Sequence, residues 1–348
     1  MIISASYRTD IPTFYGAWFM NRLHAGYCKT VNPYGRQFYT IDLTPGNVDG
    51  FVFWTKNIGP FLKHLPEVRQ RGYPFIVQHT ITGYPHELEY RVINYTHTVE
   101  HMKALADNYG PRVAVWRYDP IVISSLTPVD WHRHNFENLA RSLEGSTDEV
   151  IVSFAQIYKK TRRNMDGAAK EFGFRWHEHE VMTLEDIRHL VAELAQVAGS
   201  HGMHMKICSQ RDFLIPGITQ EARCVDAERL EEVSGKPLTS SIKLKGNREE
   251  CGCYASRDIG EYDTCPHGCV YCYAVQHRDL ALERYKAHDP TSEFLFPPGD
   301  YVPQTDERME LPQIIPAPQA RNRKPSAGSS GGPKSDSSST RQQSLFEI

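Results

Sequence analysis

Short apolar stretches rich in β-branched and aromatic residues alternate along most of the chain with longer segments of helical periodicity. The apolar stretches predict strands over residues 2–6, 51–55, 75–80, 113–117, 150–154 and 205–208. The amphipathic segments predict helices over residues 13–25, 58–70, 94–108, 130–144 and 184–200. Parallel neighbours need crossover connections and bury both faces, so this alternation predicts an α/β fold. We expect a parallel (β/α) barrel, either partial or closed.

Polar side chains follow several of these strands at the point where each strand ends. The first strand leads into Tyr7-Arg8-Thr9-Asp10, the third ends in Gln78-His79-Thr80, and the fourth leads into Arg117-Tyr118-Asp119. In parallel barrels the active site lies at the carboxyl ends of the strands. We therefore expect a binding site at this edge, although polar residues are also ordinary where strands enter loops.

Composition limits the function classes. The chain has 348 residues, enough for one barrel-sized domain with additions. No stretch approaches the ~20 apolar residues of a transmembrane helix, and the first residues carry no secretion signal, so we expect a cytoplasmic protein without a membrane partner. The net charge of −3 gives no overall attraction to nucleic acid. A nucleic-acid site would need a local basic cluster, such as Lys159, Lys160, Arg162 and Arg163.

The composition changes near the C-terminus. From Pro316 onward the chain is rich in Pro, Ser, Gly and basic residues and cannot bury a core. We expect a folded domain over residues 1–312, which includes the cysteine-rich region 208–274, and a disordered tail over 313–348. Residues 342–346, QQSLF, resemble the peptide by which bacterial replication and repair proteins dock on the DNA sliding clamp. The resemblance implies docking through Gln342, Leu345 and Phe346.

The chain has eight cysteines, and five of them lie between Cys251 and Cys272. Disulfides are rare in the cytoplasm, so these residues are expected to be metal ligands or reactive thiols. Cys265, Cys269 and Cys272 place three thiolates within eight residues, as an iron–sulfur cluster requires. Three ligands on a four-iron cluster leave one iron open, which indicates a reactive centre. The alternative is a structural zinc site, with its fourth ligand from Cys251, Cys253 or His267.

The segment CPHGCVYCYA resembles the cluster loop of radical S-adenosylmethionine (SAM) enzymes, especially spore photoproduct lyase and its relatives. The resemblance implies a 4Fe-4S cluster on Cys265, Cys269 and Cys272, whose fourth iron binds the amino and carboxylate groups of SAM. It also implies that a one-electron donor, such as flavodoxin or ferredoxin, drives cleavage of SAM to methionine and a 5′-deoxyadenosyl radical. Tyr271 would then lie beside the adenine.

The position of this loop departs from the radical SAM pattern, in which the loop follows the first barrel strand. Here it follows most of the domain, while FVFWTKNIGPFLKHL, the segment 80–89 with its Leu-Glu, and RVAVWRYDPIV resemble the later elements in their usual order. A circular permutation explains this arrangement. Together SASYRTDIP, VFWTKN, VWRYDPI, SRDIGEYDTC and CPHGCVYCYA resemble the bacterial domain-of-unknown-function family 1848, over residues 1 to about 290.

Candidate SAM contacts come from the polar strand ends. A guanidinium suits the carboxylate of SAM because it donates two parallel hydrogen bonds. The candidates are Arg117 and then Arg8 for the carboxylate, and Gln78, Thr80 and Thr82 for the ribose hydroxyls. Two alternatives remain open: the arginines form structural salt bridges with Asp10 and Asp119, and Lys56 is either a site residue or a surface lysine.

Four further cysteines remain when Cys28 is set aside: Cys208, Cys224, Cys251 and Cys253. Four thiolates suffice for a second, fully ligated iron–sulfur cluster or for a tetrahedral zinc ion. The alternative is that Cys208 and Cys224 are small buried hydrophobic residues.

The sequence thus predicts a radical SAM enzyme. Its leading substrate class is a nucleic-acid lesion or modified nucleotide, which rests on the photoproduct-lyase resemblance and the clamp-like tail. One alternative is radical modification of a small molecule or peptide. Another is a non-catalytic zinc or iron–sulfur module that recruits partners to DNA. The sequence assigns no residue as a catalytic donor of a hydrogen atom or proton.

Overall fold

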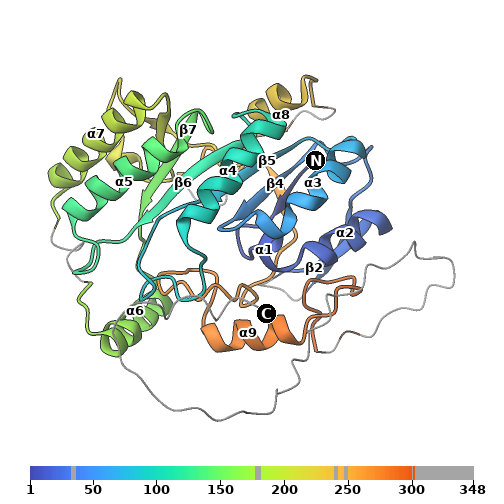
Figure 1. Cartoon of the computed structure of the whole chain (residues 1–348). Helices are drawn as coiled ribbons and strands as arrows, with labels where there is room; N and C mark the ends of the chain where they lie inside the picture. Colours follow the sequence, from blue (N-terminus) through green and yellow to red (C-terminus); the bar gives the residue numbers. More distant parts are fainter. Residues whose placement is uncertain (33–36, 177–181, 239–241, 247–249, 300, 302–348) are drawn as a thin grey trace, which may run out of the picture.

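The computed structural model describes residues 1–32, 37–176, 182–238, 242–246, 250–299 and 301. Its centre is an eight-stranded sheet in the order β10-β1-β4-β5-β6-β7-β8-β9, in which every neighbouring pair is parallel (Figure 1). The strands are β1 (Ile2–Ala5), β4 (Gly50–Thr55), β5 (Phe75–Thr80), β6 (Ala114–Ile121), β7 (Glu149–Phe154), β8 (His204–Ile207), β9 (Gln220–Glu221) and β10 (Ser256–Asp258). A separate antiparallel pair is formed by β2 (Tyr27–Val31) and β3 (Phe38–Asp42). The predicted α/β fold with a parallel sheet is confirmed.

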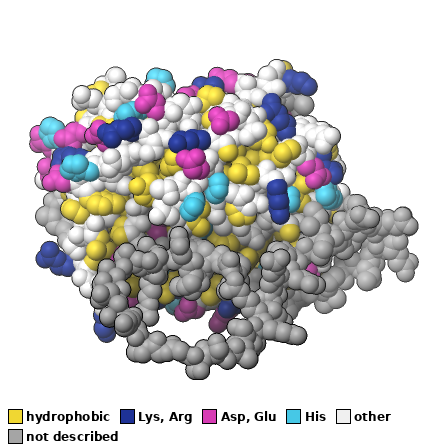
Figure 2. Space-filling model, viewed as in Figure 1, with side chains coloured by type: hydrophobic (Ala, Val, Ile, Leu, Met, Phe, Trp, Pro, Cys, Tyr) yellow, Lys and Arg dark blue, Asp and Glu magenta, His cyan; other side chains and the backbone are white. Residues whose placement is uncertain are grey.

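Helices connect the strands. They are α1 (Ile11–Phe14), α2 (Gly16–Ala25), α3 (Leu65–Gln70), α4 (Tyr95–Tyr109), α5 (Val129–Leu143), α6 (Lys159–Phe172), α7 (Leu184–Ser200), α8 (Ala227–Ser234) and α9 (Arg278–Lys286), with 3-10 turns at Gly59–His64 and Arg211–Phe213. Helix α7 begins at a reciprocal capping box formed by Thr183 and Asp186. On the face seen in Figure 2, basic and acidic side chains are interspersed over the helices.

The two faces of the sheet bury different side chains, because successive residues of a strand point to opposite faces. On one face Phe53 and Trp116 belong to the large core formed with the crossover helices. On the other face Val52, Ile76 and Val115 pack against the chain that follows β9, from Ala222 through α8 to Cys253. Described residues between β9 and β10 therefore cover this inner face, and they include three of the four cysteines of the second set, Cys208, Cys224, Cys251 and Cys253.

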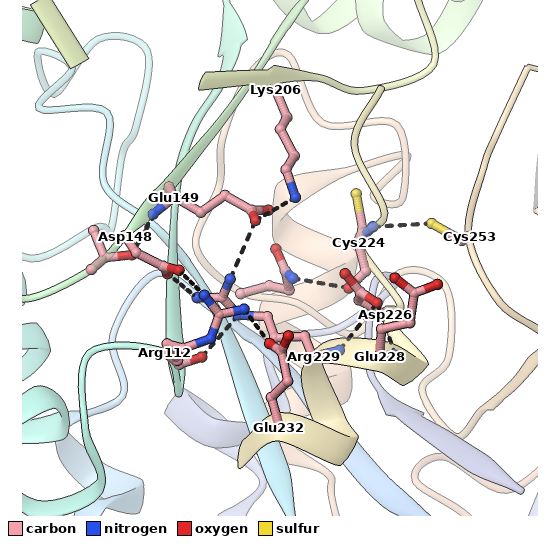
Figure 3. Close-up of polar contacts among 12 residues, drawn as sticks. Arg112, Asp148, Glu149, Lys206, Cys224, Asp226, Glu228, Arg229, Glu232 and Cys253 are labelled. Atoms are coloured by element: carbon pink, nitrogen blue, oxygen red, sulfur yellow. Dashed lines mark hydrogen bonds and ion pairs between the residues drawn. The ribbon is translucent and has the colours of Figure 1, made fainter. Parts of the chain in front are cut away.

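A buried arginine fixes α8 against the amino ends of the strands (Figure 3). Arg229 is 3% exposed; its guanidinium donates to Glu149 Oε2 at 3.2 Å, to the carbonyl oxygen of Arg112 at 2.8 Å, and to Asp148. Lys206 Nζ lies 2.6 Å from the same Glu149 oxygen. The network joins α8 to the starts of β6, β7 and β8, so α8 holds a defined place beneath the inner face.

His79 supplies a pH-dependent contribution to stability. It is fully buried in β5, and neither ring nitrogen has a hydrogen-bond partner. Burial lowers the pKa of His79 from 6.5 to about 3. Between these pH values the unfolded chain binds one more proton here than the folded chain, so stability is lost as the pH falls. We expect the free energy of unfolding, from urea denaturation, to drop by about 2 kcal/mol more between pH 7 and pH 5 in the wild type than in His79→Leu.

The matched control is His189→Leu, since the His189 side chain is 72% exposed. This variant should keep the wild-type difference between the two pH values. An equal drop in stability for His79→Leu and the wild type would contradict the account of His79.

Some predictions fall outside the described residues. They include the domain limit at residue 312, the disordered tail 313–348 and the clamp-like peptide 342–346 with Gln342, Leu345 and Phe346. Within the described residues, every helix is too short or too polar to cross a lipid bilayer.

Candidate functional site

The cysteine loop follows β10 directly and lies at the carboxyl edge of the sheet. It is tied to the segment that follows β5, although the two are far apart in the sequence. Glu89 and Cys269 form an antiparallel bridge, and the N–H of Val270 donates to the carbonyl of Leu88 at 3.1 Å. The N–H of Arg91 donates to a carbonyl of the same loop at 2.8 Å. The loop is therefore held in place by backbone contacts with the segment that follows β5.

The three sulfur atoms of this loop lie in dense surroundings. Burial raises the pKa of Cys265 to about 12, and burial also raises the pKa of Cys269 and of Cys272. Backbone N–H groups point at two of the sulfurs: those of His267 and Asp10 donate to Cys265, and that of Ala274 donates to Cys272 at 3.3 Å. Amide hydrogen bonds to sulfur stabilise a thiolate and tune iron–sulfur centres. The donors at this loop suit bound thiolates.

Asp10 holds the turn between the first two cysteines. Its Oδ2 accepts from His267 Nε2 at 2.7 Å and from the N–H of Lys56 at 2.8 Å. Burial alone would raise the pKa of Asp10, but the hydrogen bond and charge of His267 and the backbone N–H groups lower it. His267 Nδ1 lies 3.4 Å from the carbonyl of Arg91. Both ring nitrogens of His267 thus have partners, which weighs against His267 as a fourth zinc ligand.

A buried ionic cluster lies against Cys269. Lys56 Nζ lies 2.8 Å from Glu89 Oε1, and the same oxygen accepts from Thr82 Oγ1 at 2.6 Å and from the hydroxyl of Tyr271. The Lys56 side chain is only 12% exposed, and its charge lowers the pKa of Cys269. Lys56 is therefore not a surface lysine. In the sequence, Glu89 was noted only as the end of the segment 80–89 that resembles an element of radical SAM enzymes. In the structure, Glu89 is the centre of this ionic cluster.

Arg117 and Gln78 lie beside the second cysteine set. Arg117 makes a two-pronged contact with Asp119, with Nε 2.9 Å from Oδ1. Its Nη1 donates to Cys224 Sγ at 3.0 Å and to Gln78 Oε1 at 3.2 Å. Gln78 Nε2 donates to the carbonyl of Cys224 at 2.9 Å. Arg117 thus forms the structural salt bridge with Asp119 that the sequence left open as an alternative. Arg117 and Gln78 both hold Cys224 in place.

Arg8 is also paired within the chain. Its Nε lies 3.0 Å from Oδ1 of Asp258, the last residue of β10. The same carboxylate accepts from the hydroxyls of Ser4 and Ser6 at 2.8 Å and 2.7 Å. Arg8 thus ties the strand before the cysteine loop to β1. Thr80, the last of the ribose candidates, ends β5 opposite Arg117 in register and is partly exposed.

The second cysteine set comes together on the inner face of the sheet. Cys208 Sγ lies 3.5 Å from Cys224 Sγ. Cys253 Sγ accepts from the N–H group of Cys224 at 3.1 Å (Figure 3) and from that of Val225 at 3.4 Å. Cys251 contacts Cys253. Among the described residues, no three His, Cys, Asp or Glu side chains surround a common point that suits a metal ion. The cysteine sulfurs instead form a chain of neighbouring contacts from Cys208 to Cys251.

The basic cluster forms the start of α6 rather than a loop. Arg163 donates to the carbonyl of Gln276 at 2.6 Å, and Asn164 donates to the carbonyl of Val275 at 3.5 Å. The charge of Lys160 lowers the pKa of Cys272. Helix α6 therefore lies beside the end of the cysteine loop and brings the exposed Lys159 and the other basic residues to its rim.

A hollow of about 310 Å³ opens at the amino ends of β4 and β5. Its walls include Tyr73, Tyr109, Val233 and Leu238. The cysteine loop lies at the opposite, carboxyl edge of the sheet, so this hollow is not part of the candidate site.

Comparison with known families gives one match over most of the chain. The family model described as "Domain of unknown function (DUF1848)" matches residues 2–274. The matched stretch includes every strand of the large sheet and both cysteine sets. No curated protein and no solved structure gives a significant match. The comparison therefore places the cysteines within the family domain without supplying a reaction.

Proposed function

The chain belongs to the DUF1848 family, and for this member we propose a radical SAM iron–sulfur enzyme whose 4Fe-4S cluster is held by Cys265, Cys269 and Cys272. The proposal concerns the carboxyl edge of the sheet, where the cysteine loop, the Lys56–Glu89 cluster and the start of α6 come together.

The observation that carries the proposal is the place of β10. This short strand lies next to β1 in parallel register, with Ile2 opposite Ser256, although it comes near the end of the folded chain. In a radical SAM barrel the cysteine loop follows the first strand, which neighbours the second. A circular permutation that moved this strand to the end of the sequence would leave it beside β1, with the loop at the carboxyl edge. The pairing of β10 with β1 in the sheet supports this proposal.

The residues present fit such a cluster. Three thiols lie on one short loop with backbone N–H groups directed at Cys265 and Cys272, and a buried ammonium group lies near Cys269. A cluster with three thiolates carries negative charge, which these donors and Lys56 would offset. When bound, the cluster would supply the electron that cleaves SAM into methionine and a 5′-deoxyadenosyl radical.

The side chains around the loop would position SAM rather than react with it. Glu89 fixes the hydroxyl of Tyr271, whose ring lies edge-on to Tyr84 at 5.8 Å and beneath the Lys56 ammonium at 5.8 Å. The ring is thus held in one orientation beside Cys269, as a partner for adenine would be. Arg8 and Arg117 are paired with carboxylates of the chain itself, so neither of them is assigned to the carboxylate of SAM.

The rim of the site favours a nucleic acid or modified nucleotide as substrate. Exposed Lys159, Arg162 and Arg163 lie on α6 beside the loop, where they can contact phosphates. Because the net charge of the chain is −3, attraction of a polyanion would depend on a local basic cluster such as this rim.

The proposal is tested by anaerobic reconstitution of the full chain with iron and sulfide. We expect about four irons and four sulfides per chain. The reduced cluster should give an electron paramagnetic resonance signal that changes shape when SAM is added, because SAM would bind the open iron. A colourless chain without sulfide, or a signal unaffected by SAM, would contradict the proposal.

Replacing the buried lysine should weaken the site without dismantling it. Lys56→Met keeps the length of the side chain but removes the charge beside Cys269. Loss of a supporting partner of a metal ligand typically costs ~10–100-fold in activity or affinity. We expect SAM cleavage per bound cluster to fall in that range, measured after both proteins are reconstituted to the same iron content.

The matched control is Lys103→Met, since the Lys103 side chain is 44% exposed in α4. This variant should cleave SAM at the wild-type rate. Unchanged cleavage of SAM by Lys56→Met would show that Lys56 does not support the site.

A further inference from the structure

Four cysteines lie where the two edges of the open sheet meet. Cys208 directly follows β8, Cys224 follows β9, and Cys251 and Cys253 precede β10. Strands β9 and β10 are the two ends of the strand order. The backbone already joins these edges, since the N–H of Tyr254 donates to the carbonyl of Val225 at 3.0 Å.

We propose that Cys208, Cys224, Cys251 and Cys253 bind one structural zinc ion that clasps the β9 edge of the sheet to the β10 edge. The distance between the sulfur atoms of Cys208 and Cys224 favours a single zinc ion. In a tetrahedral site with Zn–S bonds of ≈ 2.3 Å, two sulfurs lie ~3.8 Å apart. The Cys208 and Cys224 sulfurs lie 3.5 Å apart.

A second four-iron cluster fits these residues less well. Its thiolates would bind separate iron atoms around a cube of iron and sulfide, so their sulfurs could not remain in direct contact. Cys224 and Cys253 are buried in one apolar cluster with Val52, Ile76 and Val115, and the Cys224 sulfur contacts the sulfurs of Cys208 and Cys253.

The surroundings also suit a zinc–thiolate site. The Cys253 sulfur accepts two backbone N–H groups, and the Arg117 guanidinium donates to the Cys224 sulfur at 3.0 Å. Four thiolates on one zinc ion carry net negative charge, and this buried arginine would offset part of it. Gln78 holds the backbone of Cys224. Gathering all four sulfurs around one ion requires side-chain rotation, because no three His, Cys, Asp or Glu side chains among the described residues are placed to hold a metal ion as they lie.

The test counts zinc and iron separately, so it does not depend on the radical SAM proposal. The full chain is purified from zinc-supplemented cells, and its metals are measured by mass spectrometry. We expect about one zinc per chain in the wild type and in the triple variant with Cys265, Cys269 and Cys272 changed to Ala. Cys208→Ser with Cys253→Ser should lose the zinc, whereas Cys28→Ser, a buried cysteine of the main core, should keep it.

A second measurement covers the case in which the double variant fails to fold. The wild-type chain is produced with Co²⁺ in place of Zn²⁺, and its visible spectrum should show the strong bands of tetrahedral cobalt with four thiolate ligands. Three results would overturn the proposal: zinc absent from the wild type, iron and sulfide remaining in the triple variant, or an intact mass about 2 Da lower from a Cys208–Cys224 disulfide.

Discussion

Changing Cys265, Cys269 and Cys272 together to Ala should reduce SAM cleavage to background and lower the iron content by about four per chain. The reason is that these three sulfurs are the proposed ligands of the cluster, and backbone N–H groups are directed at two of them. Iron, sulfide and released 5′-deoxyadenosine should be measured on the same anaerobic preparation.

The fold should survive this triple change. The loop is held by backbone bonds to Leu88 and Arg91 and by the Asp10–His267 pair, none of which uses a cysteine side chain. Circular dichroism and the elution volume should therefore match the wild type. Cys28→Ser is the control for the loss of a buried thiol, and it should keep both iron and activity. Cleavage of SAM by the triple variant would contradict the assignment of the cluster.

Arg229→Ala should lower the free energy of unfolding by about 3–5 kcal/mol, because it breaks a buried ion pair and removes one of the two cations that contact the Glu149 carboxylate. Arg229 is 3% exposed and contacts Glu149, which is 4% exposed, as well as Asp148 and two carbonyl groups. In this variant Lys206 would remain as a cationic partner of the Glu149 carboxylate. Chemical denaturation followed by circular dichroism measures this effect.

Arg112→Ala is the matched control, because Arg112 contacts the same Asp148 carboxylate from the surface with a side chain that is 49% exposed. Exposed ion pairs contribute about 0–1 kcal/mol, so this variant should unfold close to the wild type. Equal destabilisation by the two substitutions would show that burial of Arg229 is not what gives the network its strength.

The sequence predicted the alternating strands and helices of the large parallel sheet well. Residues 75–80 form β5 as expected, and the helix predicted over 184–200 is α7. These elements carry their pattern locally, in apolar runs of strand length and in helical periodicity. The two edge strands were missed, because β9 has two residues and β10 three, and so short a run has no detectable period. Their place depends on pairing with distant strands.

The candidate site could be predicted only in part for the same reason. The spacing of Cys265, Cys269 and Cys272 is local, so the loop was found from the sequence alone. The salt bridge between Arg117 and Asp119 was an alternative that the sequence left open, but the sequence could not show that Arg117 faces Cys224. The sequence likewise could not place Glu89 against Tyr271, since that contact joins segments 182 residues apart in the chain.

The most direct test of the central claim is the release of 5′-deoxyadenosine. The full chain is reconstituted anaerobically, reduced with dithionite in the presence of SAM, and the products are quantified by liquid chromatography and mass spectrometry. The proposal predicts 5′-deoxyadenosine and methionine in equal amounts, well above the triple variant of Cys265, Cys269 and Cys272. A chain that binds about four irons and four sulfides but releases no more 5′-deoxyadenosine than that variant would contradict it.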